Sequence, residues 1–322
     1  MRAVIMREFG PPGVLAPGEA PEPVAGDDQV VIDVELANIT FVETQVRAGR
    51  PPHPSMLPAL PAILGNGVGG VIVAVGPGVG GDRVGRRVIT SLGGTGGYAQ
   101  RAVGAAQRLV EVPGGVTMRD AVALLADGRT ALSLAGLAQP RAGETVLVEA
   151  AGGGVGTLLV QLARNAGARI VAVAGSERKL ALADELGADV SVDYRDNGWP
   201  QHVRDSVGTV DVAFDGVGGA IGAAAFGLLG AGGRFCPFGM ASGSFTAIDA
   251  EDAGARGVAV LHGAVPTPDG LLALTHNALD EAAAGRLRPV IGQEFALEDA
   301  AAAHAAIEGR ATIGKTLLVV RL

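Results

Sequence analysis

The chain has 322 residues, with 25 Lys or Arg against 33 Asp or Glu, which gives a formal net charge of −8 at pH 7. This acidic balance argues against a general nucleic-acid-binding protein, and no basic run or aromatic cluster offsets it. Hydrophobic residues make up 48% of the chain, but no apolar run approaches the roughly 20 residues of a membrane span and residues 1–7 lack the apolar length of a signal peptide, so we expect a cytoplasmic protein of about two domains.

Residues 1–121 consist of short Val- and Ile-rich runs separated by Gly and Pro. Three of these runs predict strands, at residues 29–35, 70–76 and 82–89. Short strands with frequent turns are typical of a mostly antiparallel sheet or barrel.

Residues 122–262 alternate between apolar runs and helical patterns, which predicts an α/β fold with a doubly wound parallel sheet. The expected strands begin at Thr145 and then cover residues 169–174, 189–192, 210–214 and 233–238. The tail, residues 263–322, carries helical patterns around 271–284 and 298–308 and a last predicted strand at 315–320.

A glycine-rich turn after the first of these strands is the most informative stretch of the chain. Glycine lacks the Cβ that would keep a diphosphate away from the backbone, and the helix that follows offers unpaired N–H groups and a positive dipole end. A second strand arrives about twenty residues later, as a βαβ unit requires. We therefore predict a dinucleotide site; the alternative is a glycine-rich connection without a ligand. The expected contacts in this turn are Ala151, Gly153, Gly154, Val155 and Gly156.

The end of the second strand indicates which nucleotide binds. Enzymes that prefer NAD usually carry Asp or Glu here, whereas this chain has Gly175 and Ser176, then Glu177, Arg178 and Lys179. The small residues leave room for a 2′-phosphate, Ser176 can donate to it, and Arg178 or Lys179 can neutralise it. We therefore predict NADPH; the alternative is a solvated helix start.

Cys236 is the only cysteine, which rules out an intramolecular disulfide and a cysteine-built zinc site. It stands near the end of a predicted strand. We expect a packed thiol there; the alternative is a reactive one.

Short motifs follow one another in a fixed order along nearly the whole chain. They include Glu8-Phe-Gly10, Leu64-Gly65, Gly69-Gly-Val-Ile-Val-Ala-Val-Gly-Pro-Gly-Val79, Gly97-Tyr-Ala99, Gly128-Arg-Thr-Ala131, Ala151-Gly-Gly-Gly-Val-Gly156, Asp193-Tyr-Arg195, Asp215-Gly-Val-Gly218 and Gly314-Lys315. In this order and spacing they resemble the zinc-independent quinone oxidoreductases, the ζ-crystallin-like members of the medium-chain dehydrogenase/reductases.

The resemblance implies a GroES-like catalytic domain made from residues 1–121 and 263–322. A Rossmann NADP-binding domain, residues 122–262, is inserted between these parts, with the cofactor in the cleft between domains and a homodimer formed through the Rossmann sheet. Gly175, Lys179 and Tyr194 fall on the family's NADPH phosphate contacts. The further expected cofactor contacts are Asp215, Gly216, Val217, Phe238, Gly239, Gly314 and Lys315.

The sequence predicts that no metal is bound. Alcohol dehydrogenases of the same superfamily place His-Glu where this chain has Asn66 and Gly67, and no pair of its five histidines has metal-ligand spacing. We expect His304, in an Ala-rich helical pattern, to be a structural or surface residue. Without zinc to polarise an alkoxide, hydride transfer to a conjugated acceptor is favoured over alcohol oxidation.

Thr130 is the candidate nicotinamide contact or proton donor; the alternative is a hydroxyl that caps a helix start. Thr40 and Gln45 replace the Asn and Tyr that line the quinone side of the pocket in relatives, and Asp127 stands where a Gln is usual, so the pocket is expected to differ. Its candidate lining residues are Thr40, Phe41, Gln45 and Asn66, with ordinary loop or core residues as the alternative. Tyr98 is expected to be a packed loop aromatic.

Together these features predict an NADPH-dependent, zinc-independent oxidoreductase that acts on a small-molecule quinone or an α,β-unsaturated carbonyl. One alternative is an enoyl reductase that acts on a thioester or a polyketide-like intermediate. The other is a non-catalytic NADPH-binding protein, crystallin-like or RNA-binding.

Overall fold

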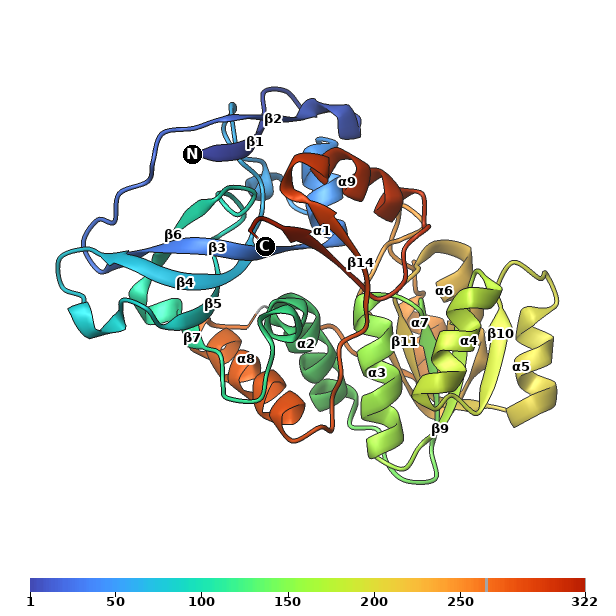
Figure 1. Ribbon diagram of the computed structural model, residues 1–322. Coiled ribbons are helices and arrows are strands. Elements are labelled where there is room, and N and C mark those ends of the chain that lie inside the picture. The colour runs from blue at the N-terminus through green and yellow to red at the C-terminus, as the bar shows by residue number, and fades with distance from the viewer. Residues whose placement is uncertain (264–265, 322) are drawn as a thin grey trace. The chain divides into compact units, whose positions relative to one another are not determined.

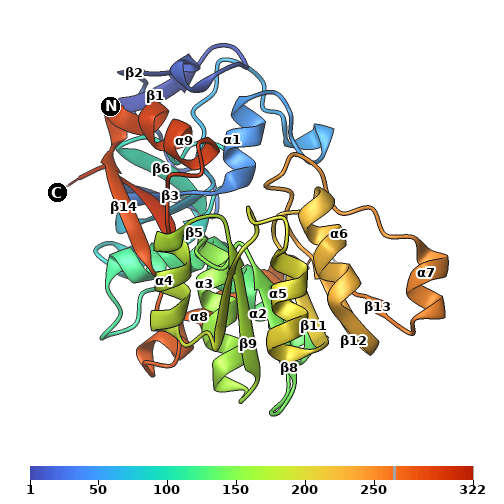
Figure 2. The same cartoon turned by 90° about the vertical axis from the view of Figure 1, so that its right-hand side faces the viewer.

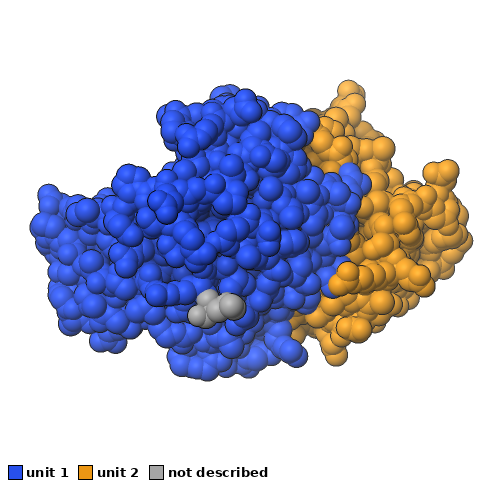
Figure 3. All heavy atoms as spheres, turned by 45° about the horizontal axis from the view of Figure 1, so that its top comes forward, with its two compact units in different colours: residues 1–126, 267–322 blue, residues 127–266 orange. Residues whose placement is uncertain are grey.

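The computed structural model describes residues 1–263 and 266–321, which divide into two compact units (Figure 3). Unit 1 comprises residues 1–126 and 267–322, and unit 2 comprises residues 127–266. The sequence pattern predicts these divisions at 121/122 and 262/263. The first division lies later because helix α2, Met118–Ala138, begins inside the apolar core of unit 1, where Ala121, Val122 and Leu125 are buried.

Unit 1 is built on a seven-stranded sheet with the order β14-β15-β3-β4-β5-β7, in which β6 also pairs with β3 (Figure 1). The bounds of these strands are β3 Gln29–Ile39, β4 Gly67–Val75, β5 Arg87–Ser91, β6 Arg101–Ala105, β7 Val110–Glu111, β14 Ile291–Ala296 and β15 Lys315–Val319. All pairs are antiparallel except β14 with β15. A separate antiparallel pair is formed by β1, Arg2–Met6, and β2, Leu15–Glu19.

The antiparallel sheet predicted for the first third of the chain is confirmed, but one predicted strand is wrong. Residues 81–83 form a short 3-10 turn, and β5 begins only at Arg87. Gly85 has a φ of +88°, a conformation that interrupts an extended run.

Three helices belong wholly to unit 1: α1, Phe41–Arg47; α8, Pro268–Ala283; and α9, Ala300–Glu308. A capping box starts α1, because the Thr40 hydroxyl accepts from the Glu43 backbone N–H while the Glu43 carboxylate accepts from the Thr40 N–H. Helix α9 packs against α1 and buries Ala300 and Ala303 in the larger core of the unit.

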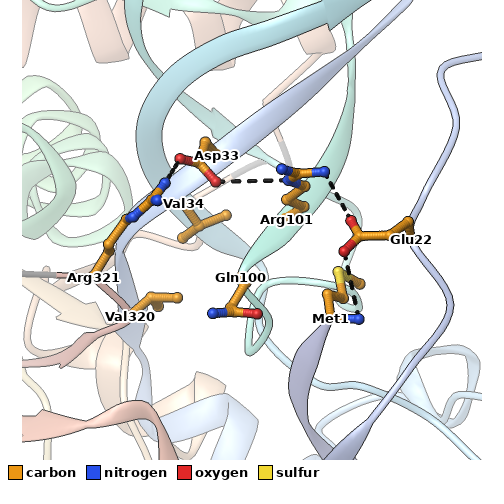
Figure 4. Close-up of a pocket in the computed structure, with 8 residues that line it drawn as sticks. All are labelled: Met1, Glu22, Asp33, Val34, Gln100, Arg101, Val320 and Arg321. Atoms are coloured by element: carbon orange, nitrogen blue, oxygen red, sulfur yellow. Dashed lines mark hydrogen bonds and ion pairs between the residues drawn. The ribbon is translucent and has the colours of Figure 1, made fainter.

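A row of ion pairs lies at one side of unit 1 and lines a small pocket (Figure 4). Arg101 pairs with Glu22 at 2.9 Å and with Asp33 at 3.7 Å, and Arg321 pairs with the same Asp33. The positive and negative charges alternate and neutralise one another, and none of the predicted site residues lines this pocket. We therefore interpret these ion pairs as structural: they hold β3, β6 and residue 321 together.

Unit 2 contains a six-stranded parallel sheet with the order β10-β9-β8-β11-β12-β13. Its strands are β8 Thr145–Glu149, β9 Arg169–Ala174, β10 Val190–Asp193, β11 Val210–Asp215, β12 Leu229–Pro237 and β13 Ala259–Val260. Its helices after α2 are α3 Gly154–Asn165, α4 Glu177–Leu186, α5 Trp199–Val207, α6 Gly219–Leu228 and α7 Ala250–Ala255. In chain order the strands run 3-2-1-4-5-6, which is the Rossmann arrangement, so the predicted doubly wound sheet is confirmed.

The sheet of unit 2 is covered by helices from its crossovers. Helix α3 packs against β8 and β9, α4 against β9 and β10, and α6 against β11 and β12 (Figure 2). The strand order reverses between β8 and β11, and in such sheets ligands bind at the carboxyl ends of the strands beside this reversal. The fold therefore directs attention to the loops that follow β8, β9 and β11.

One helix of the described chain, α2, is long and apolar enough to cross a membrane by length and composition. Its most apolar window is 56% buried inside the protein. Core helices meet the same criteria, so this observation is weak evidence for a membrane span.

Candidate functional site

The loops at the carboxyl ends of five strands in unit 2 carry most of the predicted cofactor residues. The residues Ala151–Gly156 follow β8, Gly175–Lys179 follow β9, Tyr194 follows β10, Asp215–Val217 end and follow β11, and Phe238 and Gly239 follow β12. Because the strands are parallel, these loops share one edge of the sheet. The structure thus brings the predicted residues of unit 2 to one edge.

The glycine turn leaves the start of α3 open to an anion. Gly153 is the N-cap residue of α3, and no side chain in the described part of the protein caps this end. A Cβ on Gly153 would lie 3.2 Å from the carbonyl oxygen of Ala150, whereas one on Gly156 would lie only 2.2 Å from it. Packing therefore requires glycine at position 156, whereas a Cβ at position 153 would need the Ala150 carbonyl to shift by only a few tenths of an ångström. Uncapped N–H groups beside glycines fit the diphosphate of a dinucleotide.

Lys179, in the first turn of α4, and Tyr194, after β10, each lie against one of these loops. A Cβ on Gly175 would lie 2.5 Å from the Tyr194 hydroxyl, and one on Gly152 would lie 2.6 Å from both Cβ and Cγ of Lys179. These close approaches place a phenol and a lysine stem against the turns after β9 and β8. Arg178 is exposed, whereas Lys179 is half-buried.

Ser176 is the N-cap residue of α4, and within the described chain no hydrogen bond from its side chain caps that helix. Its hydroxyl therefore lies at the start of the helix that carries Lys179. A hydroxyl, a phenol and a lysine at neighbouring strand ends suit a phosphate ester.

Asp215 and Glu149 form a buried carboxyl pair under these loops. Both side chains are fully buried, and Asp215 Oδ1 accepts from the backbone N–H groups of Val217 at 3.0 Å and Gly218 at 2.6 Å. Thr246 donates its hydroxyl to Asp215 Oδ2. The carboxylate of Asp215 is thus occupied in shaping its own loop, rather than open to a ligand.

Burial raises the pKa of Glu149 well above its ordinary value, and the hydrogen bond and negative charge of Asp215 raise it further. The Val217 N–H, 3.3 Å from Glu149 Oε2, opposes this shift only in part. Burial and the neighbouring Asp215 side chain therefore both favour the protonated form of Glu149. Sequence reasoning missed Glu149, although a carboxyl group at the end of an apolar strand is a visible signal.

The ends of β11 and β12 are held together by close backbone packing. Phe238 N–H and Gly239 N–H both donate to the Asp215 carbonyl, at 2.9 and 3.1 Å. A Cβ on Gly216 would lie 2.7 Å from the Phe238 ring. Ala151, Gly216 and Val217 are buried, whereas Phe238 and Gly239 are half-buried and can meet a ligand.

Cys236 is buried at the end of β12, and burial raises the pKa of its thiol to about 12. The prediction of a packed thiol is confirmed. A thiol this hard to ionise is a poor nucleophile.

Thr130 lies in the interior of α2 and is half-buried. The alternative of a helix-start cap is wrong, because α2 is capped by Thr117, whose hydroxyl accepts from Asp120 N–H at 3.1 Å.

Two predicted cofactor residues, Gly314 and Lys315, belong to unit 1. Gly314 has a φ of +54°, and a Cβ there would lie 2.1 Å from the Val290 carbonyl oxygen, so the backbone requires glycine. Lys315 is the first residue of β15 and is buried. Its positive charge lowers the pKa of Glu43.

Two of the candidate residues for binding the substrate, Thr40 and Asn66, both donate hydrogen bonds to the carboxylate of Glu43. Glu43 Oε2 accepts from the Thr40 N–H at 2.6 Å and from the Thr40 hydroxyl at 2.9 Å, and Glu43 Oε1 accepts from the Asn66 N–H at 2.9 Å. Asn66 in turn accepts from the backbone N–H groups of Gly93 and Gly94. The structure therefore brings Thr40 and Asn66 together, and both remain half-buried, as do Phe41 and Gln45.

Behind Glu43 lies a buried polar cluster that the sequence analysis missed. The Tyr98 hydroxyl lies 3.0 Å from His304 Nε2, and burial together with the charge and hydrogen bond of Glu43 raises the pKa of Tyr98 well above its ordinary value. Burial, with the nearby Arg47 guanidinium, lowers the pKa of His304 to about 3, so this imidazole is neutral. Arg47 is itself paired with Glu308.

Tyr98 is therefore packed, as predicted, but it is also hydrogen-bonded, and His304 is a structural residue rather than a surface one. The Thr-x-x-Glu spacing of Thr40 and Glu43 was the available sequence signal for the start of this cluster.

Within residues 1–263 and 266–321, no group of three or more His, Cys, Asp or Glu side chains could hold a metal ion. Asn66, which stands where alcohol dehydrogenases have His, uses its side chain to bind the loop at Gly93 and Gly94.

Comparison with known proteins places these features in a class. The family model of the alcohol dehydrogenase GroES-like domain matches residues 26–114, and that of the zinc-binding dehydrogenases matches residues 154–275. A GroES-like unit combined with a Rossmann unit defines an oxidoreductase of the medium-chain dehydrogenase/reductase superfamily.

Similarity to individual proteins extends over almost the whole chain. The protein is 31% identical to a 2-haloacrylate reductase of a Burkholderia species, over 99% of this chain and 98% of the relative. It is 30% identical to the quinone oxidoreductase of Salmonella typhimurium, over 97% of each. A solved mycobacterial protein complexed with NADPH is 32% identical and superposes with a TM-score of 0.89, over 99% of this chain and 100% of that one. The chain belongs to the quinone oxidoreductase family.

Proposed function

We propose that this oxidoreductase uses NADPH, without zinc, to transfer a hydride to a quinone or to an α,β-unsaturated carbonyl compound. The observation that carries the cofactor assignment is the approach of Lys179 and Tyr194 to the loops after β8 and β9. It is supported by the mycobacterial relative, which was solved with NADPH.

The residues of unit 2 are of the types that bind the phosphate groups of NADPH. The uncapped start of α3 suits the diphosphate, while Ser176, Lys179 and Tyr194 suit the 2′-phosphate. When bound, NADPH supplies the hydride. The protein's part is to bind the cofactor, to orient it and to hold the acceptor.

Two relatives support the choice of acceptor. One is named a quinone oxidoreductase and the other a 2-haloacrylate reductase, and a 2-haloacrylate is an alkene conjugated to a carboxyl group. Both substrates are electrophilic enough to accept hydride from nicotinamide without a Lewis acid. We propose that Thr40, Phe41, Gln45 and Asn66 bind the acceptor.

We propose a cytoplasmic homodimer that associates through unit 2, where β13 lies at the edge of the described sheet. Analytical ultracentrifugation tests this; a monomer at micromolar concentration would exclude it.

Oxidation of NADPH by a panel of acceptors tests the function. The panel should contain p-benzoquinone, cyclohexenone, crotonyl thioester and, in the reverse direction with NADP⁺, a simple alcohol. We expect turnover with the quinone or the enone and none with the alcohol. A clear preference for the thioester would favour the enoyl reductase, and NADPH binding without turnover of any acceptor would favour the non-catalytic protein.

A further inference from the structure

The half-buried hydroxyl of Thr40 is the outermost member of a chain of hydrogen-bonded groups that enters the core of unit 1. Thr40 Oγ1 lies 2.9 Å from Glu43 Oε2, and the Glu43 carboxyl contacts the Tyr98 phenol. Tyr98 in turn lies 3.0 Å from His304 Nε2. Glu43 is only 5% exposed, and Tyr98 and His304 are fully buried.

Hydride transfer to a conjugated acceptor must be followed by the transfer of a proton, and this chain has a side chain that can supply one. The acceptor receives two electrons and one hydrogen nucleus and becomes an enolate or a hydroquinone anion. One proton must follow to complete the reduction. A positioned acid accelerates such a transfer by about a hundredfold or more over water.

Resting on the function proposed above, we propose that Glu43 supplies this proton through the Thr40 hydroxyl. Thr40 is the catalytic residue in this relay, since it would touch the acceptor. Glu43 acts through it.

The step balances as follows for an enone. Hydride forms a C–H bond at the β-carbon, and the alkene electron pair moves toward the carbonyl oxygen. When the Glu43 carboxyl is protonated, the 2.9 Å hydrogen bond between Glu43 Oε2 and Thr40 Oγ1 runs from Glu43 to Thr40, which frees the Thr40 O–H to donate to the acceptor. The Thr40 O–H bond then breaks and its proton bonds to the enolate oxygen, while the proton on Glu43 Oε2 moves to Thr40 Oγ1. Glu43 is left as a carboxylate and regains a proton from solvent through the half-exposed Thr40.

Glu43 is suited to both of its states. Burial raises its pKa and so favours the protonated form, while the hydrogen bonds from Thr40 and Asn66 and the charge of Lys315 lower the pKa. The same N–H groups of Thr40 and Asn66 stabilise the carboxylate that remains after proton release.

The other charged and titratable groups around Glu43 do not compete as proton donors. Tyr98 has a raised pKa, and His304 on α9 is neutral with a pKa of about 3. Arg47 on α1 is paired with Glu308. Tyr98 and His304 are positioning residues that hold the far side of the Glu43 carboxyl.

The discriminating variants are Thr40→Val, which removes the hydroxyl at nearly constant volume, and Thr40→Ser, which keeps it. With NADPH and cyclohexenone, we expect Thr40→Val to lower kcat by about a hundredfold or more, with the affinity for NADPH unchanged. Thr40→Ser should recover most of this loss. In the parent, kcat should fall as pH rises through the pKa of Glu43, because the acid form is the donor.

Glu43→Gln tests the same relay by its pH profile. The amide has the shape of the carboxyl group, so we expect kcat to fall and the alkaline decline to disappear. A Glu43 that only braced the loops would change KM and thermal stability but leave the alkaline decline in place, and that result would overturn the proposal. So would equal kcat values for Thr40→Val and Thr40→Ser. Failure of the parent to reduce any acceptor would instead refute the proposed function.

Discussion

The side chain of Lys179 lies directly against Gly152, so that a Cβ on this glycine would fall 2.6 Å from both Cβ and Cγ of the lysine. The loop after β8 therefore restricts the direction of the Lys179 side chain, which extends from α4. A lysine held in this way can meet a phosphate at the strand ends with little loss of side-chain entropy.

Lys179→Ala should weaken NADPH binding by about ten- to a hundredfold, because a hydrogen bond to a charged group contributes roughly 1.5–3 kcal/mol. NADH binding should hardly change, since NADH lacks the 2′-phosphate. Calorimetric titration of both cofactors into parent and variant measures the difference. Arg178→Ala, at an exposed neighbour, is the matched control and should have the smaller effect. An equal loss for NADPH and NADH would remove Lys179 from the phosphate site.

Gly153→Val should abolish NADPH binding while the protein remains folded. The new side chain would project where the diphosphate approaches the start of α3, yet its Cβ would meet only the Ala150 carbonyl oxygen, at 3.2 Å. Calorimetry and thermal unfolding report the two properties. Gly227→Ala in α6, where no described heavy atom lies within 4 Å of a Cβ, is the control that should keep both. Undiminished NADPH affinity in Gly153→Val would contradict the dinucleotide assignment.

Purified protein should contain no stoichiometric zinc, and chelators should leave its activity unchanged. The reason is chemical: the chain has one cysteine, now seen to be buried, and Asn66 replaces the histidine that zinc-dependent relatives use. Elemental analysis that finds about one tightly bound zinc per chain would refute the zinc-independent assignment.

Glu149→Gln should make the stability of unit 2 less sensitive to alkaline pH. Glu149 holds its proton more tightly in the folded than in the unfolded state, whose pKa is near 4.5. Above that pH folding must take up a proton, so this group's contribution to stability is lost as pH rises, by up to about 1.4 kcal/mol per pH unit until the folded pKa is reached. Glutamine retains the shape and carries no titratable proton.

Urea unfolding followed by fluorescence measures this effect locally, because the single tryptophan, Trp199, lies in α5 of unit 2. The difference in the free energy of unfolding, variant minus parent, should increase as the pH rises above about 5. The raised pKa of Glu43 acts in the same direction in both proteins and cancels in the comparison. Parallel pH dependence in parent and variant would show that folding does not raise the pKa of Glu149.

Local patterns were enough to predict the Rossmann core. The apolar runs that became β8, β9 and β11 are buried in a parallel sheet and nearly continuous in hydrophobicity, so their signals are strong. Patterns at the boundaries were weaker. Residues 297–299 form a 3-10 turn before α9 begins at Ala300, and the predicted strand at 82–89 contains a turn, because short polar runs do not distinguish these conformations.

The polar cluster around Glu43 could not be predicted in this way. Its members Tyr98 and His304 stand 206 positions apart in the chain, and their contact depends on the packing of α9 into the larger core of unit 1. The pair of Glu149 and Asp215 likewise depends on two strands becoming neighbours in the sheet. Candidate residues can be identified from the sequence one by one, but only the fold shows which of them contact one another.

The pairing of β15 with β3 has a consequence for how the protein is made. Residues 36–39 of β3 pair with residues 316–319, and the Val320 N–H donates to the Glu35 carbonyl at 2.9 Å. On the ribosome, all of unit 2 emerges before these partner residues are translated. We therefore expect unit 2 to acquire its structure during synthesis, while β3 keeps an open hydrogen-bonding edge until residues 316–319 have been translated.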